Sequence, residues 1–172
     1  MALMSVPRRA AVLAVVSTLA LAGSAVLSAR QSARPLSLTD VLTAVRVADA
    51  QLSPDGKTVL YQRTTTDLAA NRRHSEVWAV PAAGGAPTAF LTSARNDTTA
   101  RWSPDGAKVA FLSTRDGGSQ VWIANADGTG ARKVTAIAGG VMPPLVWSPD
   151  GTRLAVMADV YPDCTGPGAN AC

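Results

Sequence analysis

The tetrapeptide Ser-Pro-Asp-Gly occurs three times in this chain, and its copies start 50 and then 45 residues apart. Proline fixes the φ angle that a type I turn needs at its second position. Glycine then adopts the left-handed conformation that returns the chain to an antiparallel strand. A hairpin turn repeated at roughly this period is typical of β-propeller blades. The turn residues are Ser53, Pro54, Asp55 and Gly56; Ser103, Pro104, Asp105 and Gly106; and Ser148, Pro149, Asp150 and Gly151.

The segments around each turn repeat as well, and they predict four strands in one unit. A large apolar residue precedes the turn and an apolar run follows it. A Val-Trp strand, a glycine-rich turn and a last short strand come next. This is the strand content of one propeller blade. The matching segments are Leu52, Trp102 and Trp147 before the turns; 57–61, 107–111 and 152–156 after them; 76–80 and 120–124 for the Val-Trp strands; and 82–85, 125–128, 89–92 and 132–135 for the closing turns and strands.

The apolar run after the second turn is expected to be buried on both faces. Val109 and Phe111 lie on one face of such a strand, and Ala110 and Leu112 lie on the other. A strand that is apolar on both faces belongs between two packed layers. The predicted fold class is therefore all-β, an incomplete propeller of about two to three four-stranded blades over 46–172, preceded by an N-terminal signal helix.

The first unit is longer than the second. Between the turn serine and the Val-Trp tryptophan, 25 positions separate Ser53 from Trp78, whereas 19 separate Ser103 from Trp122. The surplus falls in the polar segment 63–75, which we expect to be a surface loop. The single histidine, His74, lies in this segment, and we interpret it as a solvated loop residue with no obvious carboxylate partner.

Residues 1–29 have the layout of a secretory signal peptide. Arg8 and Arg9 form its positive end, an uncharged run follows, and cleavage is expected near Ala25 or Ala29. The alternative is an uncleaved anchor, because residues 10–29 form an uncharged run of twenty residues, which is long enough to span a bilayer. Both interpretations predict an exported protein, either periplasmic or secreted after cleavage or anchored in the membrane without it. A linker with a short helix, capped by Ser37 or Thr39 and carrying Val41, Leu42 and Val45 on its apolar side, is expected over 30–45.

The charge and cysteine content exclude some classes of partner. The formal net charge of +4 includes Arg8 and Arg9, and the remaining basic residues are scattered, so a nucleic-acid interface is not expected. Cys164 and Cys172 are a candidate disulfide in an exported chain. Free thiols, or bonds to cysteines beyond the chain, are the alternatives. A zinc site would need two more ligands, and we expect no metal or cofactor.

We assign no catalytic residue in this sequence. No G-x-S-x-G nucleophile elbow occurs, and a Ser-His-Asp triad would have to use His74. Residues 125–130 weakly resemble a calcium loop but lack its closing glutamate, so a hairpin turn is preferred. Gly84-Gly85 and Gly139-Gly140 are interpreted as turns. The four tryptophans could line a ligand platform, but their fixed place in the repeat favours packing between blades: Trp78, Trp102, Trp122 and Trp147.

The number of repeats predicts that the chain is the leading part of a longer protein. After the signal, the sequence supplies two full blades and the start of a third, whereas a closed propeller needs at least about four. Blades bury their faces only against neighbouring blades. The alternative is a complete small binding protein whose copies associate to close a ring.

The motif Trp-Ser-Pro-Asp-Gly, followed by an apolar strand and then Val-Trp, resembles the WD40-like repeat called PD40. This repeat is shared by TolB-type propellers and the prolyl oligopeptidase (S9) family, and the resemblance covers about 36–164. The segments 38–42 and 159–164 resemble the opening and the third-blade region of exported S9 peptidases, similar to dipeptidyl or acylaminoacyl peptidases.

The S9 resemblance implies a non-catalytic propeller that caps an α/β-hydrolase domain and gates the access of peptide substrates to it. The catalytic Ser, Asp and His of that family belong to the hydrolase domain, and no position in this chain matches their motifs. The implied partners are that domain and its peptide substrates. The alternative is a TolB-like propeller of the cell envelope that binds a protein partner. PD40 motifs specify the propeller well and the attached activity poorly.

Overall fold

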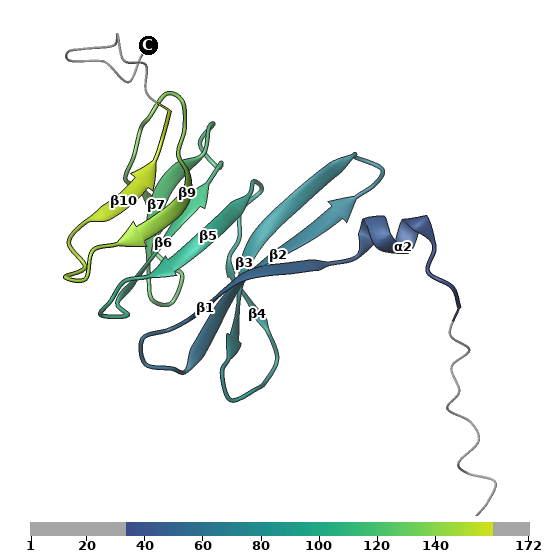
Figure 1. The fold of residues 1–172 in the computed structure, drawn as a ribbon, viewed down its shortest axis with the longest axis horizontal. Coiled ribbons are helices and arrows are strands. Elements are labelled where there is room, and N and C mark those ends of the chain that lie inside the picture. The colour runs from purple at the N-terminus through teal and green to yellow at the C-terminus, as the bar shows by residue number, and fades with distance from the viewer. Residues whose placement is uncertain (1–33, 160–172) are drawn as a thin grey trace, which may run out of the picture. The chain divides into compact units, whose positions relative to one another are not determined.

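The computed structural model describes residues 34–159, which contain one short helix and ten strands in antiparallel sheets (Figure 1). Three groups of strands follow one another along the chain, and we call them blade 1 (β1–β4), blade 2 (β5–β8) and blade 3 (β9–β10). The elements are α2 (Leu38–Thr43), β1 (Arg46–Leu52), β2 (Thr58–Asp67), β3 (Arg72–Pro81), β4 (Thr88–Leu91), β5 (Asp97–Trp102), β6 (Lys108–Ser113), β7 (Gln120–Asn125), β8 (Arg132–Lys133), β9 (Met142–Trp147) and β10 (Leu154–Met157).

The sheet topology confirms the predicted all-β, incomplete propeller. Blades 1 and 2 are four-stranded meanders in the orders β1-β2-β3-β4 and β5-β6-β7-β8, and blade 3 is a two-stranded pair. Each Ser-Pro-Asp-Gly turn joins the first and second strands of its blade. The predicted signal peptide at 1–29, and Cys164 and Cys172, lie outside the described residues.

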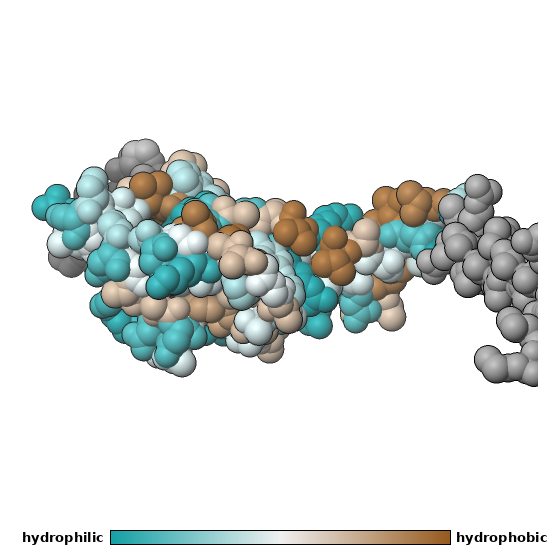
Figure 2. Space-filling model, turned by 90° about the horizontal axis from the view of Figure 1, so that it is seen from below, coloured by the Kyte–Doolittle hydropathy of each residue, from teal (hydrophilic) through white to brown (hydrophobic). Residues whose placement is uncertain are grey.

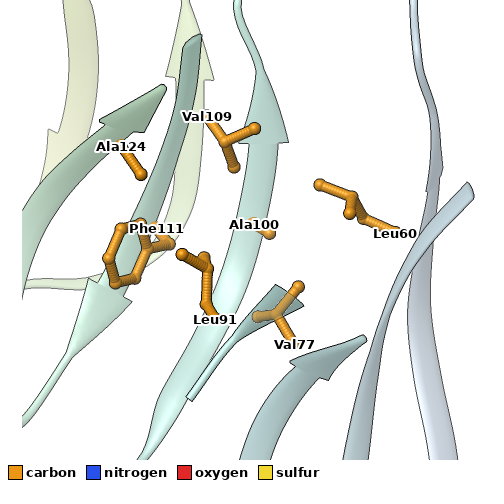
Figure 3. Close-up of a cluster of buried hydrophobic side chains, with 7 residues drawn as sticks. All are labelled: Leu60, Val77, Leu91, Ala100, Val109, Phe111 and Ala124. Carbon is orange, nitrogen blue, oxygen red and sulfur yellow. The ribbon is translucent and has the colours of Figure 1, made fainter. Parts of the chain in front are cut away.

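Blades 1 and 2 pack face to face through a cluster of buried apolar side chains. Every one of these side chains is 4% exposed or less. In Figure 3 the Phe111 ring and the Leu91 side chain point toward each other from different blades. The cluster consists of Leu60, Val77, Leu91, Ala100, Val109, Phe111 and Ala124.

The opposite face of blade 2 packs on blade 3 in the same way. Consecutive residues of β6 enter different clusters, because neighbouring side chains of a strand point to opposite faces. Phe111 packs toward blade 1, and Leu112 packs toward blade 3. The prediction that this strand buries both faces is confirmed. The second cluster consists of Ala110, Leu112, Val121, Val141 and Leu145.

The expected surface loop at 63–75 is wrong, because most of this segment is strand. β2 and β3 pair without interruption from Thr58↔Pro81 to Asp67↔Arg72, and only a short turn at 68–71 separates them. Threonines make up much of this part of β2, and β-branched residues favour strands whatever their polarity. The Thr64 and Ser75 hydroxyls also hydrogen-bond across the pair at 2.8 Å. Strands of an antiparallel hairpin can carry polar residues, because one or both faces can be exposed to water. Polar composition alone therefore does not distinguish a loop from such a hairpin.

Helix α2 precedes the first blade and buries none of its residues. The apolar residues that we expected on one side of it are exposed, with Val41 at 54% and Val45 at 50%. Figure 2 shows hydrophobic side chains gathered on the surface around this helix. Within residues 34–159, no helix combines the length and the hydrophobicity that crossing a membrane requires.

We expect Phe111→Ala to lower the free energy of unfolding by about 3–5 kcal/mol, because it empties a fully buried site between two sheets. Tyr61 is the matched control, since it lies eight residues after Ser53 just as Phe111 lies eight residues after Ser103. Tyr61 is only half-buried, so Tyr61→Ala should cost less than about half as much. Urea unfolding of the full chain measures both losses. Equal losses would contradict our interpretation that a neighbouring sheet covers the face of blade 2 that carries Phe111 but not the equivalent face of blade 1 that carries Tyr61.

Candidate functional site: turns and junctions of the blades

The three Ser-Pro-Asp-Gly turns have one shared geometry. In the second copy the Gly106 N–H donates to the Ser103 carbonyl at 2.9 Å, and Gly106 has a φ of 70°. The Ser103 hydroxyl donates to Asp105 Oδ1 at 2.6 Å, and the Lys108 N–H donates to Ser103 Oγ at 2.9 Å. Turns 53–56 and 148–151 contain the equivalent contacts. The serine therefore connects the turn aspartate to the start of the second strand of each blade.

These turns hold their aspartates in the ionised form. The serine hydroxyl, and then the backbone N–H two residues after the aspartate, lower the pKa values of Asp55, Asp105 and Asp150 below the ordinary 3.8. Hydrogen bonds to a carboxylate favour its charged form. All three side chains face solvent, so their role is to fix the turn and not to perform acid–base chemistry.

Turns of neighbouring blades also touch each other. A Cβ built on Gly106 would lie 3.6 Å from Cδ of Pro54, and one built on Gly151 would lie 3.6 Å from Cδ of Pro104. Gly106 and Gly151 therefore each face the proline ring of the preceding turn. The Ser-Pro-Asp-Gly repeat thus contributes to blade packing as well as to the hairpin.

A polar network links the first strands of the three blades. Arg101 Nη1 on β5 lies 2.8 Å from Asp49 Oδ2 on β1, and Trp147 Nε1 on β9 donates to the Arg101 carbonyl at 3.1 Å. Both carboxylate and guanidinium are about a quarter exposed, so the ion pair contributes about 1 kcal/mol or less. The sequence did not predict this network, because Arg101 is 52 residues from Asp49 and 46 residues from Trp147.

A local backbone feature positions the residues of this polar network. Asp49 and Thr99 have φ values of 53° and 55°, and both lie where the register of the first strand shifts against the second. Each residue stands four positions before its turn serine. Such bulges bend a strand and redirect its side chains. This equal spacing could have indicated a repeated bulge. It was missed because threonine rarely adopts a positive φ.

Blade 2 contains a buried ion pair under an aromatic cover. Arg115 Nη2 lies 2.8 Å from Asp97 Oδ2, and Asp97 is fully buried. The Arg115 guanidinium carbon lies 5.2 Å from the Phe111 ring centroid and 4.9 Å from that of Trp122. A buried charge is stable only with a partner. Ser113 Oγ also accepts from Arg115 Nε at 2.9 Å, and these contacts fix the arginine at the junction with blade 1.

Three of the four tryptophans lie between blades, as the repeat predicted. Trp102 and Trp122 pack against the cluster shared by blades 1 and 2, and Trp147 packs against the cluster shared by blades 2 and 3. Trp78 differs. It follows Val77, whose side chain enters the first cluster, so the indole of Trp78 points to the opposite face of blade 1.

His74 is on this same face of blade 1, in strand β3. Its Nε2 lies 3.4 Å from Glu76 Oε1, so the expectation of a loop histidine without a carboxylate partner is wrong. Glu76 also accepts from Trp78 Nε1 at 3.2 Å, and Arg63 Nη1 lies 3.6 Å from it. Glu76 therefore anchors a polar cluster. In residues 34–159 no hydroxyl group is hydrogen-bonded to His74, so this cluster is not a nucleophile–base pair.

The other sequence candidates are turns. Asp127 Oδ1 accepts from the Thr129 N–H at 2.9 Å and from its hydroxyl at 2.6 Å, so the carboxylate serves the hairpin itself. A Cβ on Gly128 would lie 2.6 Å from the Phe90 carbonyl oxygen, and this close approach explains the glycine. Within 34–159, no group of three or more His, Cys, Asp or Glu side chains is arranged to hold a metal ion.

We expect the stability of the chain to decrease in acid through the turn aspartates. Because their pKa values are lower in the folded turns than 3.8, they contribute stability above the ordinary pKa. This contribution is lost as the pH falls through the folded values. Unfolding free energies measured from about pH 6 to about pH 2 should fall less steeply for Asp105→Asn than for the unaltered chain. Asp159→Asn, an exposed control outside these three turns, should retain the steep dependence. The same slope for both variants would contradict a role of the turn carboxylate.

Comparison with known proteins identifies the repeat. The sequence family described as "PD40: TolB beta propeller domain" matches residues 40–161. An uncharacterized peptidase, YuxL, of Bacillus subtilis (strain 168) is 36% identical over 118 residues, which cover 68% of this chain and 18% of that protein. Dipeptidyl-peptidase 5 of Porphyromonas endodontalis is 32% identical over 120 residues, which cover 70% of this chain and 17% of that protein.

The fold comparison agrees with the sequence comparison. An acylaminoacyl peptidase of Pyrococcus horikoshii superposes with a TM-score of 0.57 at 20% identity, over 74% of this chain and 20% of that chain. The present chain spans less than a fifth of the length of both curated relatives described above. The resemblance to the propeller portion of S9 peptidases is confirmed by these matches. The chain belongs to the PD40 family of TolB β-propeller domains.

Proposed function

We propose that this chain is the non-catalytic, N-terminal propeller portion of an exported serine peptidase of the S9 type. Its role is to gate the access of peptides to an α/β-hydrolase domain of the parent protein. The observation that carries this proposal is the match of 118 residues, at 36% identity, to 18% of the length of the uncharacterized peptidase YuxL.

The packing of the blades supports a larger ring. The face of blade 2 that carries Phe111 and Trp122 packs against blade 1. The equivalent face of blade 1 carries Tyr61 and Trp78, which pair across β2 and β3 as Phe111 and Trp122 pair across β6 and β7. Both Tyr61 and Trp78 remain half-buried. A further blade packed on this face would complete their burial, as blade 1 does for the second blade.

The gating role follows from what a ring of blades can do. Blades packed through buried clusters form a rigid wall, and a wall in front of an active site admits extended peptides more easily than folded proteins. Within the described residues, the polar clusters at Glu76 and Asp97 are ion pairs and contain no activated nucleophile. The chemistry is therefore assigned to the hydrolase domain of the parent.

The coding sequence beyond Cys172 tests this proposal directly. We expect further Ser-Pro-Asp-Gly-like turns, then G-x-S-x-G, and then a late histidine. The protein from that longer reading frame should cleave dipeptidyl or acylaminoacyl chromogenic substrates, whereas the purified chain of 172 residues should not. A stop codon with no hydrolase downstream would defeat the proposal. Further repeats without a nucleophile elbow would instead favour the TolB-like alternative, a propeller that binds a protein partner of the cell envelope.

Export is tested separately. Residues 1–29 fused to alkaline phosphatase should give periplasmic activity, and the mass of the mature chain should correspond to cleavage near Ala25 or Ala29. A fusion with Arg8 and Arg9 replaced by glutamate is the control, because the signal requires a positive end. Fusion protein that stays in the cytoplasm, without phosphatase activity, would contradict export. An uncleaved mass in the membrane fraction would favour the anchor.

A further inference from the structure

The extended β2–β3 hairpin of blade 1 forms one wall of a small basic cavity. The cavity has a volume of about 120 Å³ and lies between the start of β3 and the connection from blade 1 to blade 2. A carboxylate or another small anion fits this volume. The polar residues that line it are Arg72, Arg73, His74, Arg95, Asn96 and Thr114.

Hydrogen bonds from both blades hold the floor of the cavity. The Ser75 N–H of β3 donates to Asn96 Oδ1 at 2.9 Å. The Asn96 N–H donates to Thr114 Oγ1 at 3.2 Å, and the Thr114 N–H donates to the Asn96 carbonyl at 3.1 Å. Asn96 therefore ties the hairpin of blade 1, through its side chain, to the end of β6, through its backbone. These hydrogen bonds join residues on two sides of the cavity, and a preorganised site favours binding.

The charge around the cavity is positive and unneutralised. Within residues 34–159, Arg72, Arg73 and Arg95 form no ion pair. Of the nearby carboxylates, Glu76 contacts Arg63 and His74, and Asp97 contacts Arg115. Asp67, which pairs with Arg72 across the hairpin, accepts a hydrogen bond from the Ala70 N–H. The side chains of Arg72 and Arg73 point to opposite faces of β3, and Arg72 shares its face with His74, which also lines the cavity. Arg72 and Arg95 are therefore the pair considered as ligands of an anion, because guanidinium pairs especially well with carboxylate.

The same wall offers the free edge of a strand. β4 pairs with β3 only at Val77, Trp78 and Ala79, so within residues 34–159 no strand pairs with the first residues of β3 on that side. The Ser75 N–H points to this side, because it reaches Asn96. Backbone groups alternate in direction along an antiparallel strand. The N–H and carbonyl of Arg73 therefore point to the same open side, where an extended peptide can pair with them.

We propose that this edge and cavity bind an extended peptide segment through an acidic side chain. The peptide backbone pairs with the edge of β3 at Arg73, and its carboxylate enters the cavity and accepts hydrogen bonds from the guanidinium groups of Arg72 and Arg95. The site is independent of the hydrolase activity proposed above, because all of its parts belong to blade 1 and its junction with blade 2.

Titration of a capped Thr-Val-Glu-Val-Thr peptide against fluorescently labelled full chain at nanomolar concentration tests this site. The same peptide with glutamine in place of glutamate should bind at least about tenfold more weakly, because it loses charge-assisted hydrogen bonds. The double variant Arg72→Gln/Arg95→Gln should bind the glutamate peptide about tenfold more weakly than the unaltered chain does. Both arginines are exposed, so the variant should fold.

The control is Arg132→Gln/Arg153→Gln, which removes the same charge from exposed positions outside the cavity and should bind as the unaltered chain does. A peptide with N-methylated backbone amides should bind weakly, because it cannot pair with a strand edge. The proposal is overturned if the glutamine peptide or the methylated peptide binds equally well, or if both double variants weaken binding alike. It is also overturned if inorganic phosphate binds and the glutamate peptide does not.

Discussion

Burial of both faces of β6 is the constraint on which the rest of this structure depends. Phe111 packs on one side and Leu112 on the other, in two separate clusters. Each fully buried side chain of this kind contributes about 1.5–3 kcal/mol, but a sheet one layer thick cannot cover either of its own faces. Blade 2 therefore depends on both blade 1 and blade 3, which cover its two faces.

Hydrophobic contact has no direction, so polar contacts at the blade junctions fix how the sheets meet. Arg101 bonds to Asp49 and to Trp147, and in this way it connects the first strands of all three blades. At the turns, Gly106 packs against Pro54. Asn96 bonds to Ser75 and Thr114 at the connection between blades 1 and 2. These contacts are worth little individually, but together they select one relative position of two apolar faces.

The turns and strands that repeat could be predicted from the sequence, but the longer hairpin and the contacts between distant residues could not. Alternation along β6 predicted both of its buried faces, because period two is a local property of a strand. The length of the β2–β3 hairpin was missed, because polarity was taken as a sign of a loop although threonine favours strands. The pair Asp97–Arg115 was also missed. A charge can be buried only when a partner is placed by the fold, and nothing local in the sequence marks that partner.

The arginines of the repeated blade core differ in their role from those of the proposed peptide site on blade 1. At the end of β6 in blade 2, Arg115 is neutralised by Asp97 and covered by aromatic rings, so it serves the packing of the sheets. At the start of β3 in blade 1, Arg72 and Arg73 stand in residues added to the repeat, and they remain exposed. An exposed guanidinium keeps its hydration and needs no partner to be stable. Insertion into a hairpin therefore places charge beside a rigid junction without disturbing the clusters, and this lets a propeller vary what it binds while its blades stay the same.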